Sequence, residues 1–295
     1  MSIDLLAIGT VTRDIETADP ASVDYVLGGT VSFAAVTAAR LGYSPAILTR
    51  AGDDVDLTVL HEIASVHVLP SERTTTFANL YSPAGRVQYC YTPSPPIGAR
   101  DIPPQLRAPR IALLGPLANE VLPDVAAAFA TETIVAAVPQ GWMRRWDSDG
   151  RVFPCAWTTM TDILPLLDVL ILSIEDIDGE LQLLREFLKY TSLVILTEYR
   201  DGSTVYRRAG DEVETFPVPP RPADELDPTG AGDIFATAFL LRLAATGDPL
   251  DAARYANVTA SFGVEARGVA GIPTHAEVLA YMAEHPWQAC GSAST

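Results

Sequence analysis

One short stretch of the chain, DPTGAGD at residues 227–233, combines two glycines with a carboxylate directly before an apolar run. Glycine inside a helix costs about 1 kcal/mol relative to alanine, so Gly230 and Gly232 need a local reason. The unpaired N–H groups and the positive dipole end at a helix N-terminus attract anions, and small residues let a phosphate approach closely. The stretch therefore predicts a helix that begins near Ala231, with an anion site at its start.

Asp233 lies in the first turn of this expected helix. The helix dipole favours its charge, but a carboxylate repels a bound phosphate and is therefore a poor phosphate ligand. The same carboxylate suits a general base that takes a proton from an attacking hydroxyl. A glycine-softened helix cap with an acid that merely suits the dipole is the alternative that these residues leave open.

The elements around this stretch follow a strand-then-helix rhythm along nearly the whole chain. Short apolar runs without polar alternation are typical of parallel strands that are buried on both faces. The expected strands are residues 3–9, 46–51, 110–115, 134–138, 169–173 and 193–197, and the expected helices include SFAAVTAARLG, PDVAAAFAT and GELQLLREFLKYT. This order predicts an α/β fold with a central, mostly parallel sheet and helices on both faces.

The segment 74–92, TTTFANLYSPAGRVQYCYT, breaks this rhythm. Two strand-like halves flank a turn signal at residues 82–85, and apolar and aromatic residues alternate with more polar ones in the second half. A hairpin of this kind cannot join the parallel core, so we expect it to pair with the segment 10–27 in a small side sheet. The hairpin is either an ordinary edge hairpin or a lid that covers a substrate.

Bulk composition narrows the function classes. Lys and Arg number 20 against 37 Asp and Glu, and the resulting net charge of −17 argues against a nucleic-acid or anionic-membrane surface. No apolar run reaches membrane-spanning length, and the N-terminus lacks a signal-peptide layout. Cys90, Cys155 and Cys290 lack the spacing of a zinc site or a disulfide framework. We therefore expect a cytoplasmic, reduced chain, with one domain over residues 1–285 and a flexible tail at 286–295.

The motif DPTGAGDIFATAF at residues 227–239 resembles the C-terminal signature of the PfkB (ribokinase-like) carbohydrate kinases. The likeness extends over nearly the entire chain. Other matching elements are Asp14 after the first strand, GGTVSFAAVTAARLG from Gly28, RAGDD from Arg50 and ANVTASFGVEARGVAGIP from Ala256. Three details look like the inositol-kinase branch of the family. They are the stretches GGxxSF and ERTTTF, and a serine, Ser173, in the segment that matches the family's metal-binding element.

The resemblance implies a ribokinase-like fold with a small β lid, whose strands lie within about 10–27 and 74–92. It also implies a homodimer formed through that lid, and small-molecule partners only: a polyol or sugar and a nucleotide. The cofactors that it implies are ATP and Mg²⁺, with K⁺ as a monovalent cation. No nucleic-acid or membrane partner is expected.

The resemblance also assigns roles to individual residues. Asp233 matches the family's catalytic base, and Gly230, Ala231 and Gly232 match its anion hole. The positions that match acceptor-binding residues are Asp14, Gly28, Gly29, Phe33, Gln140 and Arg144. The positions on the nucleotide side are Ser173, Thr197, Gly202, Asn257 and Gly268. Asp176 matches an indirect Mg²⁺ helper, and Asp227 and Thr229 match positions near the monovalent cation.

Several positions depart from the family pattern. Ser173 and Asp176 replace the asparagine and glutamate of the family's Asn-x-x-Glu metal element, and Tyr199 replaces a glycine. Phe33 replaces the asparagine of ribokinase-type enzymes. An aromatic side chain suits an apolar ring face of a cyclitol better than a hydroxyl-rich furanose. The alternative is that Phe33 is a core residue of its helix, and Asn257 a hydrogen-bonded core residue of another.

The leading interpretation is an ATP-dependent kinase that phosphorylates a hydroxyl of myo-inositol or a related cyclitol. Another sugar or nucleoside kinase of the same fold is the nearest alternative. A catalytically inactive family member that serves as a binding module is the alternative from a different class.

Overall fold

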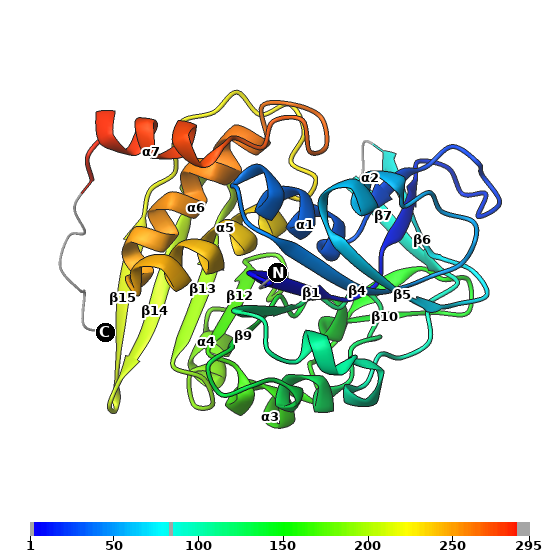
Figure 1. Cartoon of the computed structure of the whole chain (residues 1–295), viewed down its shortest axis with the longest axis horizontal. Coiled ribbons are helices and arrows are strands. Elements are labelled where there is room, and N and C mark those ends of the chain that lie inside the picture. Colours follow the sequence, from blue (N-terminus) through cyan, green and yellow to red (C-terminus); the bar gives the residue numbers. More distant parts are fainter. Residues whose placement is uncertain (1–2, 83–84, 288–295) are drawn as a thin grey trace.

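A nine-stranded sheet forms the centre of the computed structural model, which describes residues 3–82 and 85–287 (Figure 1). The strand order is β15-β14-β13-β12-β9-β8-β1-β4-β5. In chain order these strands are β1 (Leu5–Ile8), β4 (Pro45–Ala51), β5 (Ser65–Pro70), β8 (Ile111–Leu114), β9 (Ile134–Ala137), β12 (Val169–Ser173), β13 (Leu193–Thr197), β14 (Ser203–Ala209) and β15 (Glu212–Val218). All neighbours from β5 to β13 pair in parallel, and β14 and β15 continue the sheet antiparallel.

Helices cover both faces of this sheet because its strands are apolar on both sides. Along β1, Leu5 and Ala7 belong to one hydrophobic core, and Leu6 and Ile8 belong to the other. One face carries α1 (Thr30–Arg40), α2 (Thr58–Ile63), α5 (Ala231–Thr246), α6 (Pro249–Gly263) and α7 (His275–Glu284); the other carries α3 (Met160–Ile163) and α4 (Gln182–Phe187) (Figure 1). The predicted fold class is thereby confirmed.

The expected strands are all present, but two helix predictions were inaccurate. The stretch PDVAAAFAT forms a 3₁₀ helix at Pro123–Ala128 instead of an α-helix. In GELQLLREFLKYT only Gln182–Phe187 is α-helical. The edge strands β5 and β15 and the neighbouring strand β14 had not been predicted. The hairpin of β10 (Arg144–Trp146) and β11 (Val152–Pro154) had not been predicted either.

A separate four-stranded sheet, called the side sheet below, lies at one end of the molecule in the order β3-β2-β6-β7 (Figure 1). Its strands are β2 (Thr12–Ile15), β3 (Val26–Gly28), β6 (Thr75–Ser82) and β7 (Gly85–Tyr91). The predicted pairing of segment 74–92 with segment 10–27 is therefore confirmed, although turn residues 83 and 84 lie outside the described residues. On the far side of β7, the backbone N–H of Cys90 donates to the carbonyl of Gly150 at 2.7 Å. The β10–β11 hairpin thus covers part of that edge.

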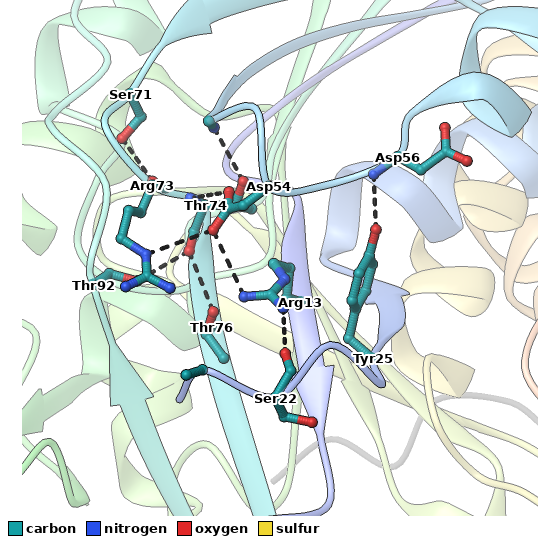
Figure 2. A network of polar contacts seen from close by, with 12 residues as sticks. Arg13, Ser22, Tyr25, Asp54, Asp56, Ser71, Arg73, Thr74, Thr76 and Thr92 are labelled. Carbon is teal, nitrogen blue, oxygen red and sulfur yellow. Dashed lines mark hydrogen bonds and ion pairs between the residues drawn. The ribbon is translucent and has the colours of Figure 1, made fainter. Parts of the chain in front are cut away.

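A network of polar contacts joins the side sheet to the loop that follows β4 (Figure 2). Arg13 of β2 is buried, and its Nη1 lies 3.6 Å from Oδ2 of Asp54. The Asp54 carboxylate also accepts the backbone N–H of Thr74 at 2.9 Å and lies 3.7 Å from Nε of Arg73. Because Arg13 directly precedes Asp14, this network fixes the strand that carries the candidate acceptor-binding acid.

The C-terminal end of the chain is packed as far as the structure describes it. Trp287, the last described residue, is partly buried and packs against the hydrophobic core. The flexible tail predicted at residues 286–295 stays a prediction. The rest of that prediction, including Cys290, falls on residues 288–295, outside the described part of the chain. Within residues 3–82 and 85–287, no helix is long and apolar enough to cross a membrane.

Candidate active site

The glycine-rich loop leads directly into α5, which begins at Ala231 as the sequence predicted. Gly232 lies in the first turn, and a Cβ atom placed on it would meet no atom within 4 Å. Open space therefore lies beside the N-terminus of a 16-residue helix. This is the arrangement in which the free N–H groups of a helix start can receive an anion.

Gly230 is required for two separate reasons. Its φ of 76° lies in the left-handed region, where a side chain is strained. A Cβ atom on Gly230 would also lie 2.2 Å from Cε1 of Phe33. The Phe33 ring is only 6% exposed and packs with Ile234 and Ile272. This burial favours a packing role for Phe33, and its contact with an acceptor stays a prediction.

Asp233 is partly buried, and charged groups from several elements surround it. Burial raises its pKa to about 6, and the carboxylates of Asp176 and Asp14 contribute to the rise. A hydrogen bond from the Thr30 hydroxyl and the positive charge of Arg144 act in the opposite direction. A carboxyl group with a pKa near 6 is ionised at neutral pH and is still basic enough to accept a proton.

Three of the predicted acceptor-binding residues, Asp14, Gly28 and Gly29, lie where β2 meets the start of α1. Oδ1 of Asp14 accepts a hydrogen bond from the Thr12 hydroxyl at 2.8 Å. A Cβ atom on Gly28 would lie 2.3 Å from Oδ2 of Asp14, so a larger residue would displace the carboxylate. Gly29 has a φ of 97°, and a Cβ there would lie 2.5 Å from the carbonyl oxygen of Thr10. The paired glycines thus let the chain turn into α1 directly beside Asp14.

Two further predicted acceptor-binding residues, Gln140 and Arg144, lie near Asp176. Its Oδ2 accepts the backbone N–H of Ser173 at 2.8 Å, which fixes the turn after β12. Burial raises the pKa of Asp176, while this hydrogen bond, the charge of Arg144 and a hydrogen bond from the Gln140 side chain partly offset the rise. The structure therefore groups Gln140, Arg144 and Asp176 near the candidate base.

A buried carboxylate that the sequence did not reveal holds the neighbouring loop. Glu120 accepts the backbone N–H groups of Thr10 at 3.0 Å and of Ala118 at 2.7 Å, beside the ends of β1 and β8. Burial raises its pKa, and the backbone hydrogen bonds act against that rise. The next residue back, Asn119, donates from Nδ2 to the carbonyl of Arg144 at 2.8 Å. The loop therefore supports the backbone from which Arg144 projects.

The metal-ligating side chains of this site suit Mg²⁺ only if a bound substrate supplies further ligands. Among the described residues, no group of three or more His, Cys, Asp and Glu side chains could hold a metal ion. Mg²⁺ in phosphoryl-transfer enzymes is usually held by one or two carboxylates, water and substrate phosphates. Asp176 fits this role, because a cation near it would offset the repulsion between its carboxylate and that of Asp233.

The predicted cation and nucleotide positions meet at Asp227. Its carboxylate accepts the backbone N–H of Thr229 at 3.0 Å and the backbone N–H of Gly268 at 2.8 Å. Burial works to raise the pKa of Asp227, but these hydrogen bonds outweigh it and the pKa is lowered. Asn257, in contrast, is buried and donates to the carbonyl of Val218 at 2.7 Å. A nucleotide contact of Asn257 stays a prediction.

Tyr199, at the position where the family pattern has a glycine, lies in the left-handed backbone region that favours glycine. Its φ is 53°, and the residue is 64% exposed. It lies two residues after Thr197, the last residue of β13. Burial of the hydroxyl and its hydrogen bond to Glu175 raise the pKa of Tyr199. Gly202, at the end of the same turn, has a φ of 93°. The Tyr199–Glu175 contact thus joins the loops that follow two neighbouring parallel strands.

Thr30 is a second residue near this site, after Glu120, that the sequence analysis did not predict. It directly follows Gly28-Gly29 and is buried, and its hydroxyl donates to the carboxylate of Asp233. Its position after the paired glycines was the only signal in the sequence. A threonine at a helix start is common for capping reasons alone, so that signal did not distinguish a partner of Asp233.

Comparisons with known proteins show what this chain is similar to. A family profile described as pfkB family carbohydrate kinase matches residues 119–275. An inositol 3-kinase of Zea mays is 32% identical over 188 residues, which are 62% of this chain and 46% of that protein. An inositol 3-kinase of Oryza sativa subsp. japonica is 27% identical over 291 residues, which are 92% of this chain and 70% of that protein. The chain thus spans about half the length of the maize relative.

A solved structure shares the fold of most of the chain. It is a pyrophosphate-dependent kinase in the ribokinase family, complexed with a pyrophosphate analog and myo-inositol. The TM-score is 0.75 at 20% sequence identity, with 94% of this chain and 99% of that chain covered.

Proposed function

The chain belongs to the pfkB family of carbohydrate kinases, and from this premise we propose that it phosphorylates a hydroxyl of a small polyol or sugar. The preferred acceptor in this proposal is myo-inositol or a related cyclitol. The two inositol 3-kinase relatives support this choice of acceptor.

The observation that carries the proposal is the position of Asp233. A partly buried carboxylate with a pKa of about 6 lies in the first turn of α5, beside open space at Gly232. Asp14 and the paired glycines border the same place from the acceptor side. A base between an anion site and a hydroxyl-binding acid is what phosphoryl transfer to an alcohol requires.

In the proposed reaction, Asp233 takes the proton of the acceptor hydroxyl as its oxygen attacks the terminal phosphorus of the donor. The new O–P bond forms while the bond from that phosphorus to the leaving phosphate oxygen breaks. The N–H groups of Gly230 and Gly232 and the guanidinium of Arg144 stabilise the charge on the transferring group. The N–H of Ala231 donates to the carbonyl of Pro228 at 3.1 Å and would have to be shared with that group. Mg²⁺, when bound with the donor near Asp176, supplies further charge neutralisation.

ATP is the proposed donor, because the motifs of the C-terminal half resemble those of ATP-dependent family members. The pyrophosphate-dependent neighbour makes pyrophosphate the second candidate. Tyr199 is the residue that favours testing it, since a large exposed side chain stands where the family pattern has glycine. The roles of Asp227 and Thr229 toward K⁺, and a homodimer through the side sheet, stay predictions.

A donor-and-acceptor panel tests the proposal. Mg·ATP and Mg·pyrophosphate are each supplied with cyclitols, hexoses, pentoses and nucleosides, and phosphorylated product is quantified. We expect the highest kcat/KM with myo-inositol or another cyclitol. Higher turnover on a pentose or nucleoside would move the protein to another kinase class of this fold. Turnover on no acceptor with either donor would favour a binding module.

The side sheet provides a prediction about motion. If it is a lid, a bound acceptor should lower amide exchange in β6 and β7 more than in the central strands β8 and β12. Hydrogen exchange followed by mass spectrometry, with and without the acceptor that the panel identifies, measures this difference. Equal exchange in the two states would reduce segment 74–92 to an edge hairpin.

A further inference from the structure

Helix α1 presents Thr30 and Phe33, one turn apart, to the start of α5, where the candidate base lies. We propose that Thr30 is a positioning residue, whose hydroxyl holds the Asp233 carboxylate in the orientation that faces the acceptor. This role rests on the proposed function, because it requires Asp233 to act as the base. It extends that function to a residue that does not itself react.

The side chain of Thr30 has little freedom to turn away from Asp233. It is 3% exposed, and a Cβ atom placed on Gly115 would lie 2.4 Å from its Cγ2. The methyl group therefore packs against the end of β8, while the hydroxyl donates to Asp233. Because a β-branched side chain in a helix has restricted χ1 rotation, fixing the methyl group also fixes the hydroxyl.

The same helix start fixes the acceptor side. Thr30 follows Gly28 and Gly29 in the chain, and Gly28 lies against the carboxylate of Asp14. The Ser32 hydroxyl donates to the carbonyl of Gly28 at 2.7 Å, which ties the glycine to the first turn of α1. One rigid segment thus contacts both the candidate hydroxyl-binding acid and the base.

The loop before Asp233 is held by the next turn of α1. The Phe33 ring occupies the place that a side chain on Gly230 would fill, and it packs on Ile234 of α5. Thr30 and Phe33 therefore both contact the start of α5, at Asp233 and at Gly230 and Ile234 respectively. Without the Thr30 hydroxyl, the Asp233 carboxylate would still be present but would lose the donor that sets its rotamer. Misplacement of a catalytic group by about 1 Å is enough to cost on the order of 10²-fold in rate.

Three variants of the full-length chain test this role. Thr30→Val keeps the shape and removes the hydroxyl, Thr30→Ser keeps the hydroxyl, and Thr37→Val is the matched control. Thr37 lies on the same helix and is fully buried, and its hydroxyl has no hydrogen-bond partner in the part of the chain that the structure describes. Steady-state kinetics are measured with Mg·ATP and myo-inositol, or with the best donor and acceptor of the panel, and thermal unfolding is followed in parallel.

For Thr30→Val we expect kcat to fall by about 10- to 100-fold while KM for the acceptor changes less than about threefold. Thr30→Ser should recover most of the lost kcat, and Thr37→Val should match the wild type. A Thr30→Val enzyme with more than half of wild-type kcat would overturn the role, as would a Thr30→Ser enzyme as slow as Thr30→Val. Asp233→Asn is assayed beside them: if it stays active, the proposed base fails whatever Thr30 does. If it is inactive while Thr30→Val is normal, only the positioning role fails.

Discussion

Replacement of Asp233 by asparagine should lower kcat by on the order of 10²–10⁴ while nucleotide binding survives. Asparagine has nearly the same shape as aspartate but cannot accept the proton of the acceptor hydroxyl. The wild type and the variant are compared by steady-state kinetics and by a direct binding titration with the donor. A variant that keeps more than a tenth of wild-type kcat would remove Asp233 from the role of base.

The pH dependence gives an independent measurement of the same role. Because the ionised form of Asp233 is the active one and its pKa is about 6, wild-type kcat/KM should fall about tenfold per unit below pH 6. In Asp233→Asn this limb should be absent. A wild-type profile that stays flat down to pH 5 would contradict the assignment.

Stability should change in the opposite direction from activity. Folding raises the pKa of Asp233 from 3.8 to about 6, so the contribution of this group to stability is fully present below pH 3.8 and is lost as the pH rises through 6. At pH 7.5 the ionised carboxylate therefore opposes folding. Asp233→Asn should unfold at the same temperature as the wild type or at a higher one, which differential scanning calorimetry measures.

The sequence predicted those parts of the site that depend on local chain geometry. Gly230 and Ala231 define a helix start through backbone conformation and the dipole, and α5 begins at Ala231 as expected. Buried strands such as β8 and β12 were recognisable because a parallel strand covered on both faces is apolar throughout. The pairing of segment 74–92 with segment 10–27 followed from its alternating pattern and from its exclusion from a parallel core.

Other parts depend on contacts between distant segments, and no local pattern encodes them. The partner of Thr30 lies about 200 residues away in the chain, and Glu120 is recognised only by the N–H groups that surround it. Phe33 was predicted either beside the acceptor or in the core of its helix, and the structure packs its ring on Gly230. That contact depends on how α1 and α5 cross, which neither helix shows by itself.

The two loop glycines should respond to substitution in different ways, and this contrast tests the anion site. Gly232→Val should lower kcat/KM by on the order of 10²–10³, the usual effect of losing one anion-hole contact. Thermal stability should change little, because Gly232 is not in the left-handed region and a Cβ there meets no atom within 4 Å. The valine side chain would instead occupy the open space at the start of α5, where the phosphoryl group is expected to bind.

Gly230→Ala is the comparison for Gly232→Val. It adds fewer atoms, but at a position where even a Cβ atom would clash. A φ of 76° costs a non-glycine residue about 1–2 kcal/mol, and the new Cβ would press on the buried Phe33 ring. We therefore expect Gly230→Ala to lower both activity and the unfolding temperature, and Gly232→Val to lower activity alone. Kinetics and calorimetry on both variants separate the two glycines.

If Gly232→Val unfolds at a temperature as low as Gly230→Ala does, both glycines are structural and the start of α5 is an ordinary helix cap. If it folds normally and binds the donor as tightly as the wild type, the open space at Gly232 is not where the phosphoryl group binds.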